Sequence, residues 1–278
     1  MNLTPGQPGR AADVVAAEGR IVATLQKRGY ADAVTDPREV VVDHADRSVR
    51  PTFRIDAHDI VRLDGLRVRT RGRTNPAWVS RLTPWKQGQI YDPILVGELE
   101  RRLLDTGVYD SVTVALAPTA ETDAKGLRPV VVSLADRARA TITLGASYST
   151  YEGIGVDGSY SLYNRLHRAD TLSFIGAYSD IQKRVQVELS LPHWLKPQQT
   201  LKLDAVAFQD DTDAYREEDV GLRADLQKRL GKTSFRTTGV SLDANNNDEK
   251  ELDPQGNVVG VNRKFISLAR SEAENVRT

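Results

Sequence analysis

The second half of the chain alternates between apolar and polar residues with a period of two, and this pattern constrains the fold more than any other feature. Four consecutive segments show it, over residues 141–149, 154–162, 172–179 and 184–191. A period of two places successive side chains on opposite faces of a β-strand, so each segment predicts a strand with one apolar face. The residues predicted on that face are Ile142, Leu144, Ala146, Tyr148, Ile154, Val156, Tyr160, Leu162, Leu172, Phe174, Tyr178, Val185, Val187, Leu189 and Leu191.

Four later segments alternate less regularly and are also predicted to be strands. They cover residues 201–208, 220–230, 235–244 and 258–268. The opposite face of the first four strands carries Ser, Thr, Gly and Gln as often as full charges. Such strands fit an outer-membrane β-barrel with an apolar outside and a wet lumen. A soluble β-sandwich, whose core face would be equally apolar, is the alternative.

Aromatic residues near the predicted strand ends favour the membrane barrel. Tyr148, Tyr151, Tyr163 and Trp194 lie where an interfacial girdle of Tyr and Trp would lie. They are therefore predicted to mark the boundary between lipid and water.

The first half of the chain has helical spacing instead. Glycines at 29 and 107 stand where two helices are predicted to end. The predicted elements are helices over 11–28, 76–82 and 93–106, a strand pair over 40–42 and 49–55, and strands over 61–68, 112–116 and 130–134.

This half also repeats itself at a shift of 78 residues. A repeat predicts two units of strand, helix, helix, strand and strand, the first without its opening strand and first helix. Chance agreement between two similar units is the alternative. The matched positions are Leu25 and Leu103, Gly29 and Gly107, Asp32 and Asp110, Val34 and Val112, and Arg50-Pro51 and Arg128-Pro129.

Composition excludes several classes of protein. The chain has 38 Lys and Arg against 38 Asp and Glu, which argues against a nucleic-acid partner. It has no cysteine, so disulfides and thiolate chemistry are excluded. No apolar run is long enough for a transmembrane helix, and the charges within residues 1–30 interrupt any secretory signal sequence.

No motif predicts catalysis, a cofactor or a small-molecule substrate. Residues 153–158 match G-x-G-x-x-G, but a second alternating strand follows where the dinucleotide fingerprint needs a helix, so a β-hairpin is expected. The arginines at 62, 67, 69, 71 and 73 are predicted to lie on a solvated face.

Metal binding is not predicted either. The four histidines, His44, His58, His167 and His193, lack helical zinc spacing and are expected on the surface or in loops. Asp210, Asp211, Asp213 and the run 245–248 could in principle bind calcium, but they lack the EF-hand pattern and are predicted to form long polar hairpin loops.

Several motifs, in this order, resemble the BamA/TamA superfamily of bacterial outer-membrane assembly proteins, with its TamA branch the more similar. They are Thr-Pro-Trp-Lys-Gln-Gly-Gln-Ile-Tyr-Asp at 83–92, Thr-Gly-Val-Tyr-Asp-Ser-Val at 106–112, Gly-Ala-Ser-Tyr-Ser-Thr-Tyr-Glu-Gly at 145–153 and Leu-Ser-Leu-Pro at 189–192. The sequence departs from the family at Tyr151, usually Asp, and at 57–59, usually a Gly-Pro turn.

The resemblance implies an α+β fold of polypeptide-transport-associated (POTRA) repeats, β-α-α-β-β, followed by the N-terminal part of an antiparallel transmembrane barrel. The implied domains are a partial POTRA domain over 1–56, a complete barrel-proximal one over 57–137, and barrel strands over 138–278. The family that the sequence resembles has barrels of sixteen strands, whereas this sequence predicts eight. We therefore expect the chain to be a fragment.

The implied function is assembly of outer-membrane proteins, autotransporters above all, in the bacterial outer membrane with the N-terminal domains in the periplasm. The implied partners are outer-membrane lipid, a TamB-like periplasmic protein and an unfolded client. The alternatives are a two-partner secretion transporter, a BamA-type general assembly factor, a passive porin-like channel, or a soluble carbohydrate-binding sandwich. The candidate docking strand is Ser111, Val112, Thr113, Val114 and Ala115, and the candidate seam strand that templates client strands carries Thr141, Thr143, Gly145, Ser147 and Ser149.

Overall fold

The computed structural model describes residues 6–150, 153–212, 215–231, 234–252 and 258–275. The chain divides into two compact units. The first comprises Met1–Arg69, Thr83–Leu103 and Val112–Leu134. The second comprises Thr70–Leu82, Leu104–Ser111 and Ala135–Thr278. The predicted domain boundaries after residues 56 and 137 stay predictions, because compactness divides the chain along other lines.

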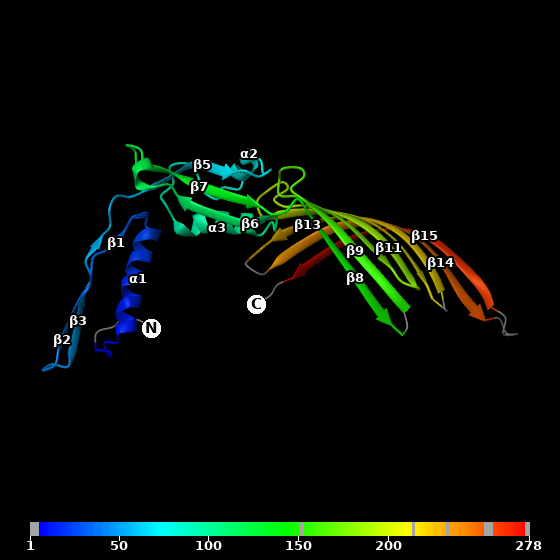
Figure 1. Ribbon diagram of the computed structural model, residues 1–278, viewed down its shortest axis with the longest axis horizontal. Coiled ribbons are helices and arrows are strands. Elements are labelled where there is room, and N and C mark those ends of the chain that lie inside the picture. Colours follow the sequence, from blue (N-terminus) through cyan, green and yellow to red (C-terminus); the bar gives the residue numbers. More distant parts are fainter. Residues whose placement is uncertain (1–5, 151–152, 213–214, 232–233, 253–257, 276–278) are drawn as a thin grey trace. The chain divides into compact units, whose positions relative to one another are not determined.

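The first elements are a helix and a long hairpin (Figure 1). Helix α1 ends at Lys27, close to the end that the sequence predicts. Gly29 stops it by taking a φ of 102°, and the Tyr30 amide donates to the Leu25 carbonyl at 3.1 Å. Strand β1 pairs with β4, and β2 pairs with β3. The bounds are α1 Ala11–Lys27, β1 Val34–Thr35, β2 Glu39–Asp43, β3 Ser48–Thr52 and β4 Ile55–Asp56.

A three-stranded sheet with strand order β5-β7-β6 follows, together with two helices. Helix α2 begins at a proline and is capped by Asn75, whose side-chain oxygen accepts the Ala77 amide at 2.9 Å. The core of this part of the chain contains side chains with no exposed surface, those of Leu63, Leu99, Val130 and Val132. All the predicted elements of this half are present. The bounds are β5 Arg62–Thr70, α2 Pro76–Ser80, α3 Pro93–Leu104, β6 Tyr109–Leu116, a 3-10 turn Thr119–Glu121 and β7 Leu127–Asp136.

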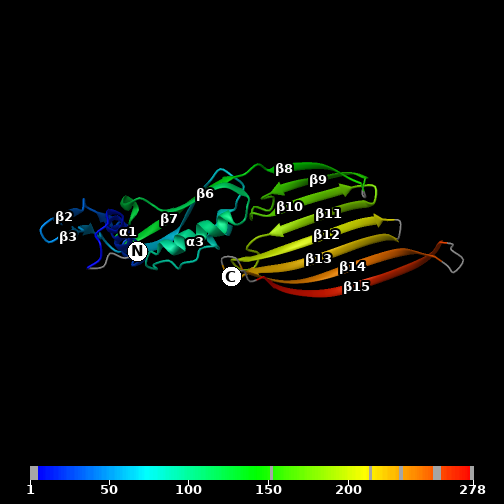
Figure 2. The ribbon, with the colours of Figure 1, turned by 90° about the horizontal axis from the view of Figure 1, so that it is seen from below.

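An eight-stranded antiparallel sheet makes up the rest of the described chain, in the order β8 to β15, each strand paired with the next (Figure 2). This order confirms the strands predicted from the alternation. Gly153–Gly158 lie within strand β9, as expected for a hairpin and not for a nucleotide loop. The bounds are β8 Ala140–Ser149, β9 Gly153–Tyr163, β10 Thr171–Tyr178, β11 Gln182–Leu191, β12 Gln199–Asp211, β13 Tyr215–Arg229, β14 Phe235–Leu252 and β15 Val258–Asn275.

The last four strands are longer than the sequence predicts. Asp210 and Asp211 lie in β12 and residues 245–248 lie in β14, so the predicted polar hairpin loops are wrong; Asp213 lies outside the described residues. Strand pairing continues there, with Asn246 opposite Glu218, although both faces have become polar. Apolar alternation ends where a face meets water, whereas backbone hydrogen bonds continue, so the pattern underestimates strand length.

Three further predictions need correction or limits. Tyr163 shares the face of Ser161, two residues earlier in β9, and the Arg137 guanidinium carbon lies 4.4 Å from its ring centroid, so it is not on the apolar face. His193 follows β11 in a turn but is buried, and its Nδ1 accepts the Gln198 amide at 2.9 Å. Tyr151 lies outside the described residues.

In the part of the chain that the structure describes, no helix is long and apolar enough to cross a membrane.

Candidate functional site: an apolar sheet face and two outer strands

The predicted apolar residues gather on one face of the eight-stranded sheet. The register pairs Ile142 with Tyr160, and Phe174 with both Tyr160 and Val187. These side chains are exposed, Leu144 by 82% and Ile142 by 68%. Leu191, at 6% exposure, is the buried exception in the predicted set. The register therefore places the predicted residues on one face of the sheet, and their contact with lipid remains a prediction.

The same face continues over strands where the sequence offered weaker signals. Val187 pairs with Ala205, and Ala205 pairs with Leu222. Leu222 pairs with Leu242, and Leu242 pairs with Leu268. Leu222, Leu242 and Leu268 are exposed. Contiguous apolar surface of this extent is costly in water and marks a membrane or protein contact.

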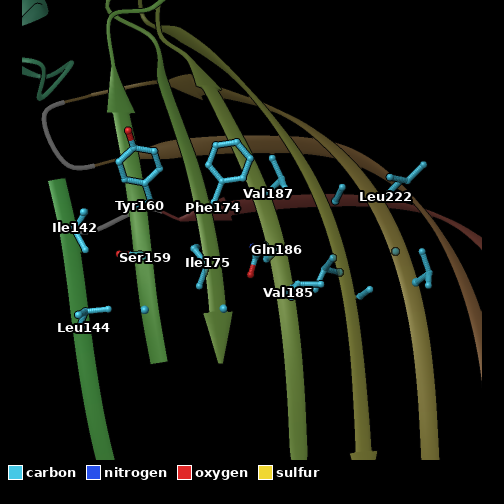
Figure 3. A pocket seen from close by; sticks show the side chains of 17 residues that line it. Ile142, Leu144, Ser159, Tyr160, Phe174, Ile175, Val185, Gln186, Val187 and Leu222 are labelled. Atoms are coloured by element: carbon cyan, nitrogen blue, oxygen red, sulfur yellow. The ribbon is translucent and has the colours of Figure 1, made fainter. Parts of the chain in front are cut away.

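Small residues hollow out the middle of this face. A cavity of about 640 Å³ lies over Gly158, Gly176, Ala205 and Ala207, between larger side chains of β8 to β13. Figure 3 shows Tyr160 and Phe174 beside it, and their ring centroids are 6.5 Å apart. Its lining is almost wholly apolar, which suits a hydrocarbon environment.

The opposite face is polar and internally paired. Ser161 and Ser173 hydroxyls lie 2.9 Å apart, Gln186 donates to Asp204 at 2.5 Å, and Arg223 pairs with Asp225 at 2.7 Å. A sheet with one apolar and one charged face matches the wall of a barrel whose lumen is wet.

Strand β8, with the candidate seam residues, is an outer strand of the eight-stranded sheet. Thr141, Thr143, Gly145, Ser147 and Ser149 share its polar face. Gly145 lies opposite Asp157, and a Cβ at Gly145 would come within 2.5 Å of an Asp157 carboxylate oxygen. Glycine therefore lets this carboxylate lie against the backbone of β8.

Strand β6, with the candidate docking residues, is an outer strand of the three-stranded sheet. Val112 and Val114 are buried, whereas Ser111, Thr113 and Ala115 are exposed. The Ala117 amide, just after the strand, donates to the Pro129 carbonyl of β7 at 2.9 Å. Because amide direction alternates along a strand, the Val114 amide points away from β7. The structure thus places an outward amide in the middle of the predicted docking strand.

An ion pair that no motif predicted, with a buried Arg128 and a partly exposed Asp32, joins the two segments that align as repeats within the first compact unit. Arg128 has a side chain only 4% exposed and donates to both carboxylate oxygens of Asp32, at 2.8 and 2.5 Å. The Arg128 hydrogen bonds lower the pKa of Asp32. The repeat alignment named both positions, but an alignment cannot show that they meet.

The predicted solvated arginines are partly confirmed. Arg67 pairs with Glu121 while more than half exposed, but Arg73 is mostly covered and lies 3.6 Å from Asp136. No cluster of His, Cys, Asp or Glu able to hold a metal ion occurs among the residues that the structure describes.

Comparisons with known proteins place this geometry in context. Residues 164–271 match the Omp85 superfamily domain. BamA from Haemophilus ducreyi lacking POTRA domains 1–3 superposes with a TM-score of 0.77 over 99% of this chain and 55% of its own, at 18% identity. CdiB from Escherichia coli gives 0.55 over 97% and 51%, at 14% identity, and CdiB from Acinetobacter baumannii gives 0.53 over 96% and 55%, at 12% identity. A comparison with curated proteins gives no match.

These findings define the fold as that of the BamA structure, with an eight-stranded sheet that resembles part of its barrel. The domain match covers most of the eight-stranded sheet, from residue 164 to residue 271, and the structural neighbours share its fold. The chain spans about half the length of the solved structures it matches.

Proposed function

We propose that this protein is a non-enzymatic factor that assembles or translocates proteins at the bacterial outer membrane, with a TamA-like role toward autotransporters. The observation that carries the proposal is the exposed apolar face, continuous in register from Ile142 on β8 to Leu268 on β15. The match of residues 164–271 to the Omp85 domain supports it independently.

Outer-membrane lipid is the proposed cover of the apolar face, with the folded α/β elements in the periplasm. Membrane fractionation and heat-modifiable gel migration of the full chain test this location. Recovery with the outer membrane and a shift on heating are expected, because strands in lipid must keep their backbone hydrogen bonds paired, and heating is needed to break this pairing. A compact monomer that stays soluble without detergent would instead favour the soluble sandwich.

Strand β6 is the proposed docking site for an extended client or a TamB-like periplasmic partner. An outer strand binds such a segment through main-chain hydrogen bonds and reads little of its sequence. Val114→Pro removes an outward amide and with it one main-chain hydrogen bond, so we expect it to weaken binding of an extended peptide about five- to tenfold. Val114→Ala is the matched control, because it also removes buried methyl groups but keeps the amide. Equal affinities of the two variants would contradict this role.

Strand β8 is the proposed seam that templates incoming client strands. The chain has no cysteine, so Ser147→Cys introduces a single reactive thiol on the polar face of this strand. A client carrying cysteines along one strand should crosslink to it in a register-dependent pattern. Crosslinking that fails at Ser147 and its neighbours would exclude a templating seam.

Two-partner secretion is the second candidate function, and the fold that the chain shares with BamA and the two CdiB structures is compatible with it. The fate of the client distinguishes the two functions. In vesicles that contain the protein, an assembled client stays in the bilayer and resists carbonate extraction, whereas a secreted client crosses and is released. Release of an intact client would favour secretion.

A further inference from the structure

The turn between β9 and β10 is built by its own buried side chains. Asn164 and Asp170 have no exposed surface. Asp170 accepts the Arg165 and Leu166 amides at 2.9 and 2.8 Å, and the Asn164 side-chain oxygen accepts the Ala169 amide at 3.0 Å. Asn164 and Ala169 adopt positive φ angles. Residues other than glycine keep this unfavourable conformation only where the surrounding contacts hold them in it, as these hydrogen bonds do. The turn is therefore held in one conformation.

The amide of Asn164 then reaches segments that lie far earlier in the chain. Its Nδ2 donates to Thr74 Oγ1 at 2.8 Å and to Asp136 Oδ2 at 3.2 Å. The Tyr109 hydroxyl lies 2.9 Å from the same Thr74 oxygen. Burial raises the pKa of Tyr109, so its hydroxyl stays protonated. All four residues belong to the second compact unit.

Asp136 is the centre of this network. It ends β7 and precedes β8 by four residues. Its Oδ2 accepts the Arg73 amide at 2.8 Å and lies 3.6 Å from the Arg73 Nε, and its Oδ1 lies 3.4 Å from the Thr74 hydroxyl. A Cβ at Gly72 would come within 2.4 Å of the Asp136 carboxylate, so glycine there leaves room for it.

The residues between Asp136 and β8 are also held. The Arg137 amide donates to the Val108 carbonyl at 3.1 Å, and its Nη1 donates to the Gly107 carbonyl at 3.0 Å. The Tyr163 amide donates to the Arg139 carbonyl at 3.0 Å. The base of β8 is thus tied both to the residues before β6 and to the end of β9.

We infer that Asp136 is a positioning residue for β8: its contacts with Arg73, Thr74 and Asn164 fix the base of the outer strand, so that an incoming strand begins to pair at that end. The pairing step rests on the proposed function, but the fixed base does not. A strand held at one end presents its first backbone groups in a defined place, which lowers the entropic cost of the first inter-strand hydrogen bonds.

Hydrogen exchange of the full chain in lipid vesicles tests the fixed base. Asp136→Ala should raise exchange in residues 140–145 about tenfold, because hydrogen bonds to a charged group are lost, with less than about twofold change in 199–229. Gly72→Ala should act in the same direction, Asp136→Asn should recover part of the protection, and Asp110→Ala, at an exposed site on β6, should have no effect. Unchanged exchange at 140–145, or an equal rise throughout β8 to β15, would overturn the positioning role.

Client crosslinking tests the direction of pairing. Thr141→Cys lies near the base of β8 and Ser147→Cys near its other end. With Asp136 present, crosslinks to a client strand should form earlier at position 141 than at 147, and Asp136→Ala should remove this order. Simultaneous crosslinks in the parent would overturn the directional inference. Crosslinks at neither position would count against the proposed function, and hydrogen exchange would still decide whether Asp136 fixes the base.

Discussion

Substitution of Phe174 by arginine tests whether the apolar face contacts lipid. Phe174 lies in the middle of β10, is 42% exposed, and stacks on Tyr160 across the strand pair. An arginine on the lipid side of a barrel costs about 2–4 kcal/mol near the bilayer midplane. Loss of the aromatic pair adds about 0.5–1.5 kcal/mol. We therefore expect Phe174→Arg to make folding into a bilayer less favourable by about 3–5 kcal/mol.

The neighbouring residue supplies the matched control. Ser173 lies on the polar face, opposite Glu188. Ser173→Arg loses the hydrogen bond between the Ser173 and Ser161 hydroxyls, about 1 kcal/mol, and gains an ion pair with Glu188 of similar size. A net change within about 1 kcal/mol is expected.

The assay is a reversible urea titration of the chain with phospholipid vesicles, with the folded fraction read from heat-modifiable migration. A difference of at least about 2 kcal/mol between the two variants is expected. Equal effects, or a larger loss for Ser173→Arg, would refute the assignment of the two faces.

Three further predictions concern residues outside the eight-stranded sheet. Asp32→Ala leaves Arg128 buried without its carboxylate and should destabilise the first compact unit by about 3 kcal/mol in urea, whereas Asp46→Ala, which removes an exposed partner of Arg50, should cost less than about 0.5 kcal/mol. Because the pKa of Asp32 is lowered on folding, its contribution should be complete above about pH 5 and be lost as the pH falls through that lowered pKa, a dependence that Asp32→Ala should remove from acid titrations. Tyr109→Phe removes the contact with Thr74 and should lower stability by about 1 kcal/mol in thermal unfolding, with no change in the far-ultraviolet spectrum.

Regular alternation made the strands predictable. Ile142, Leu144 and Tyr148 recur at every second position, and β8 forms where the sequence predicts it. The prediction of strand length failed at Asn245–Asp248, where hydrogen bonding continues after the apolar pattern has ended. Side-chain chemistry at one position cannot report how long a backbone ladder remains paired.

Burial was less predictable than secondary structure. His193 follows β11 in a turn, where a surface histidine is the ordinary expectation, yet it is buried with its ring centroid 6.0 Å from that of Trp78. These two residues are more than a hundred positions apart in the sequence. No local pattern reports such a contact.

The sequence by itself determined the positions of the helices and strands, the two faces of the eight-stranded sheet, and the resemblance to outer-membrane assembly proteins, because each depends on residues close together in the chain. The tertiary structure decided that Arg128 meets Asp32, and that Thr74, Asp136 and Asn164 share one buried network. Such contacts join residues separated by tens of positions, and their energies depend on burial and hydrogen-bond geometry, which exist only once the chain has folded.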